Sequence, residues 1–200
     1  AFGLALTALL LLTFIRTDLL TEWKKALGEG TPNYFLINIQ PSQKEGIKEI
    51  LESSDSVAPD FVPLIRARMT EINGESVQER VYPDERGSWL ANREANLSFA
   101  KKMNPNNKII DGTWWEENYD GSPLVSIEES AADDMGVKIG DDLTFLIAGE
   151  KITAKISSIR EVDWNSFSPN FFLVFSERAL ESFPASFISS MYIEEGDTGV

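Results

Sequence analysis

The chain of 200 residues contains no cysteine and no histidine. Without cysteine it has neither disulfide bonds nor thiolate nucleophiles, and thiolate metal ligands are excluded too. Without histidine it lacks the commonest general base and the commonest metal-binding side chain. Catalysis would therefore depend on carboxylates, lysines or hydroxyl groups, which is a poor starting set for an enzyme.

Basic residues are scarce as well, because 18 lysines and arginines stand against 32 aspartates and glutamates, for a net charge of −14. Residues 1–32 carry three of each sign, so the negative excess lies beyond them. Such a domain repels nucleic acid and anionic lipid head groups, and we expect no nucleic-acid partner. The Gly-x-x-x-x-Gly-Lys-Ser/Thr loop that cradles nucleotide phosphates is also missing, so ATP hydrolysis is not expected in this chain.

A charge-free apolar run occupies residues 1–15, and an amphipathic helical pattern continues from it to Leu27. A membrane-spanning helix needs about 20 apolar residues, so the pattern predicts a truncated transmembrane helix and stalk over residues 1–30. A signal-peptide remnant and a buried core helix are the alternatives. A signal peptide would need a preceding basic stretch and a small-residue cleavage site, and neither is present. The folded domain is expected to begin near Asn33, and its acidic character is compatible with an extracytoplasmic location.

Two segments show the order strand, helix, strand: residues 33–72 and residues 168–197. Together they predict a porter-like α/β subdomain with a split βαβ, or ferredoxin-like, arrangement. Residues 73–167 between them are too many for a loop and begin with the tight-turn pair Asn73-Gly74. We therefore expect an inserted β-rich subdomain there, and the predicted fold class is α+β.

Nine acidic residues and a single lysine lie between Glu116 and Asp142. Their spacing fits no EF-hand loop, so a solvated acidic face is favoured over a calcium site. A carboxylate pair for acid–base catalysis stays open, whereas a serine nucleophile has neither a Gly-x-Ser-x-Gly turn nor a histidine to activate it. No cofactor is predicted in this chain.

The aromatic residues offer a second candidate site. Trp114 and Trp115 supply large apolar surfaces and are candidate cargo-contact aromatics for a lipid-like ligand. Four phenylalanines further along the chain belong to the same set: Phe167, Phe171, Phe172 and Phe175. Aromatic residues at strand spacing more often fill a hydrophobic core, so core packing and ligand contact are both open interpretations of these residues.

Several motifs resemble a known transporter family. The segments Ile109-Ile110-Asp111-Gly112-Thr113-Trp114-Trp115 and, further on, residues 125–128 and 136–145 resemble in order and spacing the periplasmic core domain of MacB-like and FtsX-like ABC transporter permeases. The run Arg160-Glu161-Val162-Asp163-Trp164 with Pro169-Asn170-Phe171 is similar to the YbbP-type permease subfamily, which is encoded beside a lysophospholipase-type esterase. Residues 33–39 fit that subfamily too, so the resemblance covers essentially the whole chain.

The resemblance implies an extracytoplasmic domain on the periplasmic side of the bacterial inner membrane. It implies a cytoplasmic ABC ATPase subunit as partner, with a periplasmic esterase or cargo protein as a further one. The domain would relay ATPase-driven motion or contact a lipid-like or hydrophobic cargo, and would not be an enzyme. A membrane-anchored binding module without an ATPase is the alternative, and an extracytoplasmic enzyme using carboxylates is a third hypothesis.

Four residues of the resembling motifs form a candidate interdomain or partner-contact motif: Arg160, Asp163, Trp164 and Asn170. They fall where the inserted part returns to the porter-like part. We expect Arg160 and Asp163 to tie strand ends by charge-assisted hydrogen bonds, and Trp164 to pack the junction.

Overall fold

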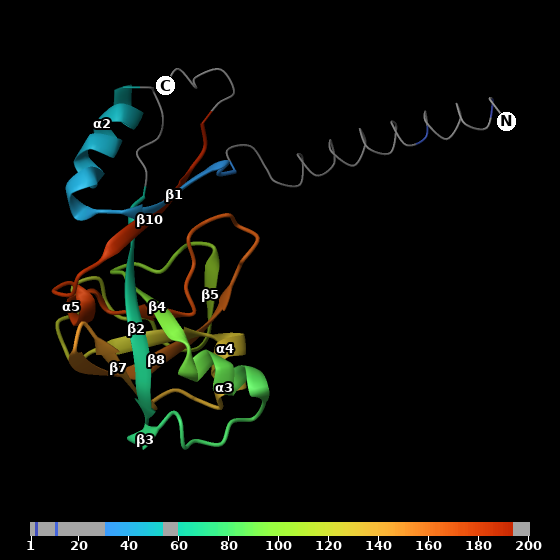
Figure 1. The fold of residues 1–200 in the computed structure, drawn as a ribbon, viewed down its shortest axis with the longest axis vertical. Coiled ribbons are helices and arrows are strands. Elements are labelled where there is room, and N and C mark those ends of the chain that lie inside the picture. Colours follow the sequence, from blue (N-terminus) through green and yellow to red (C-terminus); the bar gives the residue numbers. More distant parts are fainter. Residues whose placement is uncertain (1–2, 4–10, 12–30, 54–59, 194–200) are drawn as a thin grey trace.

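The computed structural model describes Gly3, Leu11, residues 31–53 and residues 60–193 (Figure 1). The predicted transmembrane helix and stalk over residues 1–30 therefore lie, apart from Gly3 and Leu11, outside the described residues. Within the described ranges, no helix is both long enough and apolar enough to cross a membrane.

Six of the described strands pair in a closed ring and form a small β-barrel. In ring order they are β2 (Val62–Ile72), β4 (Glu94–Phe99), β9 (Leu173–Phe175), β6 (Leu124–Glu128), β8 (Glu150–Val162) and β7 (Asp142–Ile147). The ring closes because β7 pairs with both β8 and β2. The β4–β9 and β6–β8 pairs are parallel, and the other neighbours in the ring are antiparallel. Two further strands extend it: β3 (Glu75–Ser76) pairs with β2, and β5 (Asn107–Gly112) pairs with β8.

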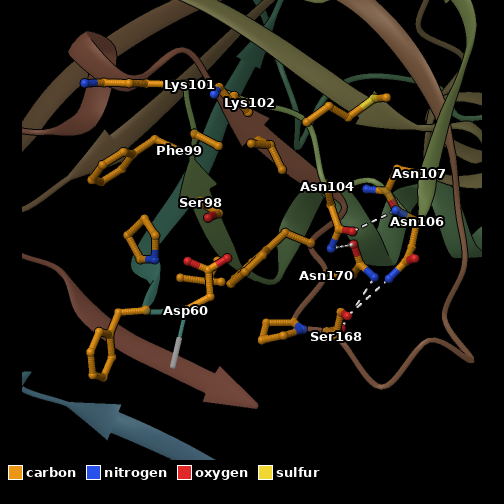
Figure 2. Close-up of a pocket in the computed structure, with 18 of the residues that line it drawn as sticks. Asp60, Ser98, Phe99, Lys101, Lys102, Asn104, Asn106, Asn107, Ser168 and Asn170 are labelled. Atoms are coloured by element: carbon orange, nitrogen blue, oxygen red, sulfur yellow. Dashed lines mark hydrogen bonds between the residues drawn. The ribbon is translucent and has the colours of Figure 1, made fainter. Parts of the chain in front are cut away.

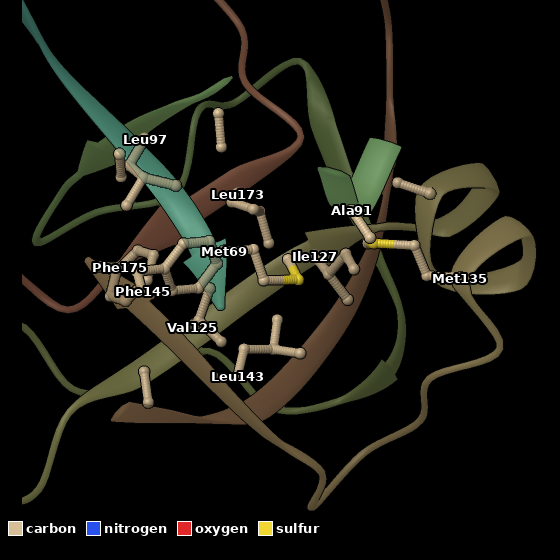
Figure 3. Packing of buried hydrophobic residues seen from close by; sticks show 14 of the residues in the cluster. Met69, Ala91, Leu97, Val125, Ile127, Met135, Leu143, Phe145, Leu173 and Phe175 are labelled. Atoms are coloured by element: carbon tan, nitrogen blue, oxygen red, sulfur yellow. The ribbon is translucent and has the colours of Figure 1, made fainter. Parts of the chain in front are cut away.

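The barrel interior holds the main hydrophobic core (Figure 3). Strand β2 has the period-2 pattern of a strand with one buried face, because Ile65, Ala67 and Met69 are buried while Arg66 and Arg68 are exposed. Across the interior from them lie aromatic and aliphatic side chains of the other strands, among them Leu97, Val125, Ile127, Leu143, Phe145, Leu173 and Phe175. The rings of Phe145 and Phe175 meet edge to face, with centroids 5.5 Å apart.

Two helices pack on each other beside the barrel, α3 (Glu85–Asn92) and α4 (Glu129–Met135). Their contact depends on a glycine: a Cβ placed on Gly87 would lie 1.9 Å from the backbone oxygen of Asp134. The α4 helix begins at the buried side chain of Glu128, which accepts a hydrogen bond from the Ala131 amide at 2.9 Å.

An outer layer lies at one end of the barrel in Figure 1. It contains β1 (Tyr34–Ile39), β10 (Ser186–Met191), the short 3-10 turn η1 (Pro41–Gln43) and α2 (Lys44–Ser53). Strand β10 pairs antiparallel with β1 on one side and with the first residues of β2 on the other. Strand β2 therefore belongs to both the outer layer and the barrel. The last helix, α5 (Glu177–Leu180), lies between β9 and β10 in the chain.

The described chain is a mixed, strand-rich α/β structure, as the sequence predicts, and both strand–helix–strand segments contain those elements. The strand pairing does not establish the predicted split βαβ arrangement, because β9, the first strand of the second unit, pairs with β4 and β6 and not with a strand of the first unit. The division into a porter-like part and an inserted part stays a prediction. Strand pairing crosses its boundaries, since the barrel takes β2 and β9 from the first part and the other four strands from the second.

Candidate functional site

A groove of about 960 Å³ lies where the outer layer meets the barrel (Figure 2). Its wall on the outer-layer side is built from the start of α2, the start of β2 and β10. Its wall on the barrel side is built from the end of β4, the loop over residues 100–107 and the loop over residues 168–171. The volume is that of a small-molecule site, for which about 300–1,000 Å³ is typical.

The outer-layer wall carries a lysine held against two aromatic rings, which we call the aromatic end. The Lys44 ammonium lies 4.1 Å from the ring centre of Phe187 and 5.5 Å from that of Phe61. Both contacts are within the range of a cation–π attraction. Because Lys44 is the first residue of α2, the contact fixes this helix over the rim of the groove.

The barrel-side wall carries a cluster of amide side chains, which we call the amide end; its labelled asparagines gather on one side of Figure 2. The Asn104 amide donates to Asn170 Oδ1 at 3.4 Å, and the Asn106 amide donates to the Ser168 hydroxyl at 3.3 Å. These bonds join the two loops of this wall, but they are long for N–H···O bonds. Asn107, the fourth asparagine, is 9% exposed, and its Oδ1 has no partner among the described residues.

Arg160 lines the groove from β8 and is the largest fully buried side chain described. Its guanidinium donates to the backbone oxygen of Ser126 at 2.7 Å, to the Ser126 hydroxyl at 3.2 Å and to the backbone oxygen of Phe171. Burial lowers the pKa of Arg160 from its ordinary value to about 10, partly opposed by the negative charge of Glu128. The Nε group of Arg160 has no partner among the described residues. Arg160 thus fixes the loop before β9 to strand β6 at the cost of a buried charge.

The predicted interdomain motif is only partly brought together. Arg160 and Asn170 both line the groove, whereas Asp163 and Trp164 line a neighbouring hollow on the surface. The Asp163 carboxylate accepts a hydrogen bond from the backbone N–H of Asn165 at 2.9 Å, so it stabilises its own turn. Trp164 is 50% exposed and lies on Phe172 with ring centres 5.1 Å apart. Arg160 alone bonds the backbone oxygens of Ser126 and Phe171, and the Asp163 carboxylate takes no part in that contact.

The two candidate cargo-contact tryptophans lie stacked, with ring centres 3.9 Å apart. Trp114 is half-buried, lines the groove and donates its indole N–H to the backbone oxygen of Lys101 at 3.0 Å. Trp115 is buried and donates to the backbone oxygen of Ala100 at 2.9 Å. The pair therefore fixes the chain just after β4, and Trp114 is the member that faces the groove.

The acidic residues between Glu116 and Asp142 are dispersed. Asp134 pairs with Arg86 at 3.1 Å, Asp142 pairs with Lys155 at 2.8 Å, and Glu128 caps α4. Across residues 31–53 and 60–193, no three carboxylates converge in a way that could hold a metal ion.

Neither the amide end nor Lys44 was among the predicted site residues. The run Asn104-Pro105-Asn106-Asn107 is a visible signal, because it places three amide side chains around a proline in one short segment. Its partner Asn170, by contrast, was among the predicted site residues.

Comparison with known proteins points to one class. No family profile matches the chain. A curated ABC transporter permease aligns with it over 197 residues, which is 98% of this chain, at 37% identity. That relative is the uncharacterized ABC transporter permease YbbP of Escherichia coli (strain K12), and this chain spans 23% of its length. A solved domain of a protein described as a permease from Porphyromonas gingivalis matches 75% of this chain and 68% of the solved chain, at 14% identity and a TM-score of 0.35.

Proposed function

We propose that the chain is the extracytoplasmic domain of an ABC transporter permease of the FtsX-like and MacB-like kind, YbbP-type, on the periplasmic side of a bacterial inner membrane. The alignment with a permease over 98% of the chain at 37% identity carries this proposal. In this proposal the chain is a transport component, and ATP hydrolysis belongs to a separate cytoplasmic subunit. A periplasmic esterase or cargo protein is proposed as a further partner.

The groove is the proposed place of contact with a lipid-like or hydrophobic cargo. Its volume suits a small amphiphile, and its lining combines Phe61, Phe99, Phe187 and Trp114 with polar groups. Large rings supply most of the contact area in such sites, and a few polar groups fix the orientation of the ligand.

Strand β2 is the proposed route by which motion reaches the groove. Its first residues pair with β10 in the outer layer, and its later residues pair with β4 and β7 in the barrel. A shift of the outer layer would therefore either move the barrel with it or break the hydrogen bonds that β2 makes with its neighbouring strands. Both groove walls are attached to this strand, so such a shift would change the width of the groove.

The test is ATP hydrolysis by the complete permease, reconstituted with its ATPase in vesicles containing a candidate lipid cargo. Phe187→Ser removes a ring from the groove, and Phe35→Ser, on exposed β1 outside the groove lining, is the matched control. We expect Phe187→Ser to abolish most of the lipid stimulation while Phe35→Ser keeps it. Equal stimulation of both variants would show that the groove does not contact the cargo.

A further inference from the structure

A row of four side chains on the surface joins three rings and one cation, in the order Trp89, Arg93, Phe172 and Trp164; we call it the tryptophan row. The guanidinium carbon of Arg93 lies 4.3 Å from the ring centre of Trp89 and 5.8 Å from that of Phe172. The rings of Phe172 and Trp164 follow, with centres 5.1 Å apart. We propose that the tryptophan row docks a segment of a partner protein that carries an aspartate or glutamate between apolar side chains.

The backbone beneath the tryptophan row is fixed by hydrogen bonds. Arg93 caps the end of α3, and its backbone N–H donates to the backbone oxygen of Trp89 at 3.1 Å. The backbone oxygen of Phe172 accepts from the backbone N–H of Glu128 at 2.8 Å, and the Phe172 ring packs against the barrel core. Because this backbone is in place before a partner arrives, docking loses little conformational entropy there.

Both ends of the tryptophan row are open to solvent although they are large and apolar. Trp89 is 57% exposed and Trp164, a predicted partner-contact residue, is 50% exposed. Tryptophan and arginine are among the residues that most often dominate the binding energy of protein interfaces. The tryptophan row lies outside the groove lining, so the proposal goes beyond the proposed function, and its failure would leave that function in place.

The charge of Arg93 selects the chemistry of the partner. In the described part of the chain, no carboxylate lies within 4.0 Å of its guanidinium, which contacts the two rings. Contact with ring faces uses none of its five N–H donors, and two of these match the two oxygens of a carboxylate. A small anion would touch Arg93 alone, whereas a peptide segment can also cover the rings on either side of it.

The surrounding charges limit how acidic that segment can be. The elements of the tryptophan row and their neighbours also carry exposed carboxylates: Glu85, Glu94, Glu129 and Asp163. The whole chain has a net charge of −14, so a run of acids or an anionic membrane would be repelled. A single carboxylate can pair with Arg93 while its apolar neighbours cover the tryptophans.

The test begins with a phage-displayed library of random twelve-residue peptides, selected on the full 200-residue chain. Equilibrium binding of the enriched peptides is then measured by fluorescence polarisation. Each acidic peptide is compared with a counterpart in which the aspartate or glutamate is replaced by asparagine or glutamine. We expect the enriched peptides to place an acid between apolar residues, and the amide counterparts to bind about tenfold more weakly, as expected for the loss of a charge-assisted hydrogen bond.

Variants of the chain locate the contact. Arg93→Gln should remove the preference for the acidic peptide, and Arg93→Lys should keep a preference of about 2–5-fold, because an ammonium lacks the planar fork. Trp89→Ser and Trp164→Ser should weaken both members of each peptide pair. Arg68→Gln, an exposed arginine of β2 outside the tryptophan row, is the matched control and should change neither.

The peptide pairs separate a lost contact from a damaged fold. A variant that does not fold loses both members of a pair and its thermal unfolding transition, whereas loss of the carboxylate contact removes only the preference for the acid. Enriched peptides without an acid, peptides that bind Arg93→Gln as they bind the wild type, or a library from which nothing is enriched would each overturn the proposal.

Vesicles of phosphatidylglycerol are the last arm of the test. Saturable binding of the chain to these vesicles, removed by Arg93→Gln, would show that the tryptophan row contacts an anionic membrane and would overturn a protein partner. Failure of the proposed function shows separately, in the lipid-stimulated ATP hydrolysis of the complete permease.

Discussion

Replacing the buried Arg160 by methionine tests how the groove wall is held. The variant keeps a long unbranched side chain but removes the hydrogen bonds to the backbone oxygens of Ser126 and Phe171. A buried acceptor left without its donor costs about 1–3 kcal/mol, so two of them cost about 2–6 kcal/mol. The variant also removes a buried charge whose pKa is lowered by burial to about 10, which corresponds to a penalty of about 3 kcal/mol on that charge. The two effects oppose each other, and we expect a net loss of about 1 kcal/mol at pH 7.

The pH dependence separates these two effects. Arg160 has a pKa of about 10 in the folded chain and the higher, ordinary pKa of a solvated guanidinium in the unfolded chain. Between these values the unfolded state binds more protons, so the wild type gains stability as the pH rises, and the methionine variant does not share this gain. The difference in unfolding free energy between the two proteins should widen by about 2 kcal/mol from pH 8 to about pH 11.5.

The assay is urea unfolding at pH 7, 8 and 11.5, followed by tryptophan fluorescence. Lysine and tyrosine titrations occur in both proteins and cancel in the difference. Arg68→Met, on the exposed face of β2, is the control and should change stability by under about 0.5 kcal/mol at every pH. A wild-type advantage that stays constant or shrinks between pH 8 and 11.5 would refute the argument that burial penalises the Arg160 charge.

Three further predictions concern the fold. Gly87→Ala should lower the unfolding free energy by about 3 kcal/mol or more in thermal unfolding, because the added Cβ would collide with the backbone of α4. The control is Gly46→Ala on α2, which has open space around it and should raise the unfolding free energy by up to about 1 kcal/mol. A Gly87→Ala variant as stable as the wild type would contradict this packing. Phe145→Ala in the barrel interior should lose about 3–5 kcal/mol in urea unfolding, and a loss under 1 kcal/mol would mean the ring is not in the core. Trp115→Phe should lose about 1–3 kcal/mol through the unpaired backbone oxygen of Ala100, whereas no change would argue against that hydrogen bond.

Local patterns predicted the individual elements better than their pairing. The alternation of Ile65, Ala67 and Met69 with polar residues marks β2, because a strand with one buried face repeats every two residues. Closure of the barrel depends on β7 pairing with β2, about seventy residues earlier in the chain, and periodicity carries no information about such partners. The membership of β2 and β9 in the closed ring of strands therefore could not be predicted from their local sequences.

The candidate site shows the same limit. Arg160 and Asp163 are three residues apart, which suggested a joint role, but β8 ends at Val162, so Asp163 belongs to the following turn. Trp114 was recognised from its size, and it does line the groove. The amide end is formed by two loops more than sixty residues apart, and loop side chains have no periodicity from which their meeting could be predicted.

The most direct test of the central claim is photo-crosslinking in the complete permease. Benzoylphenylalanine replaces Phe187 in the groove or Phe35 outside its lining, and the reconstituted transporter is irradiated with radiolabelled lipid, with and without ATP. We predict lipid crosslinks at position 187 whose yield changes with ATP, and few at position 35. Equal yields at both positions, unaffected by ATP, would contradict a cargo-contacting groove driven by an ATPase.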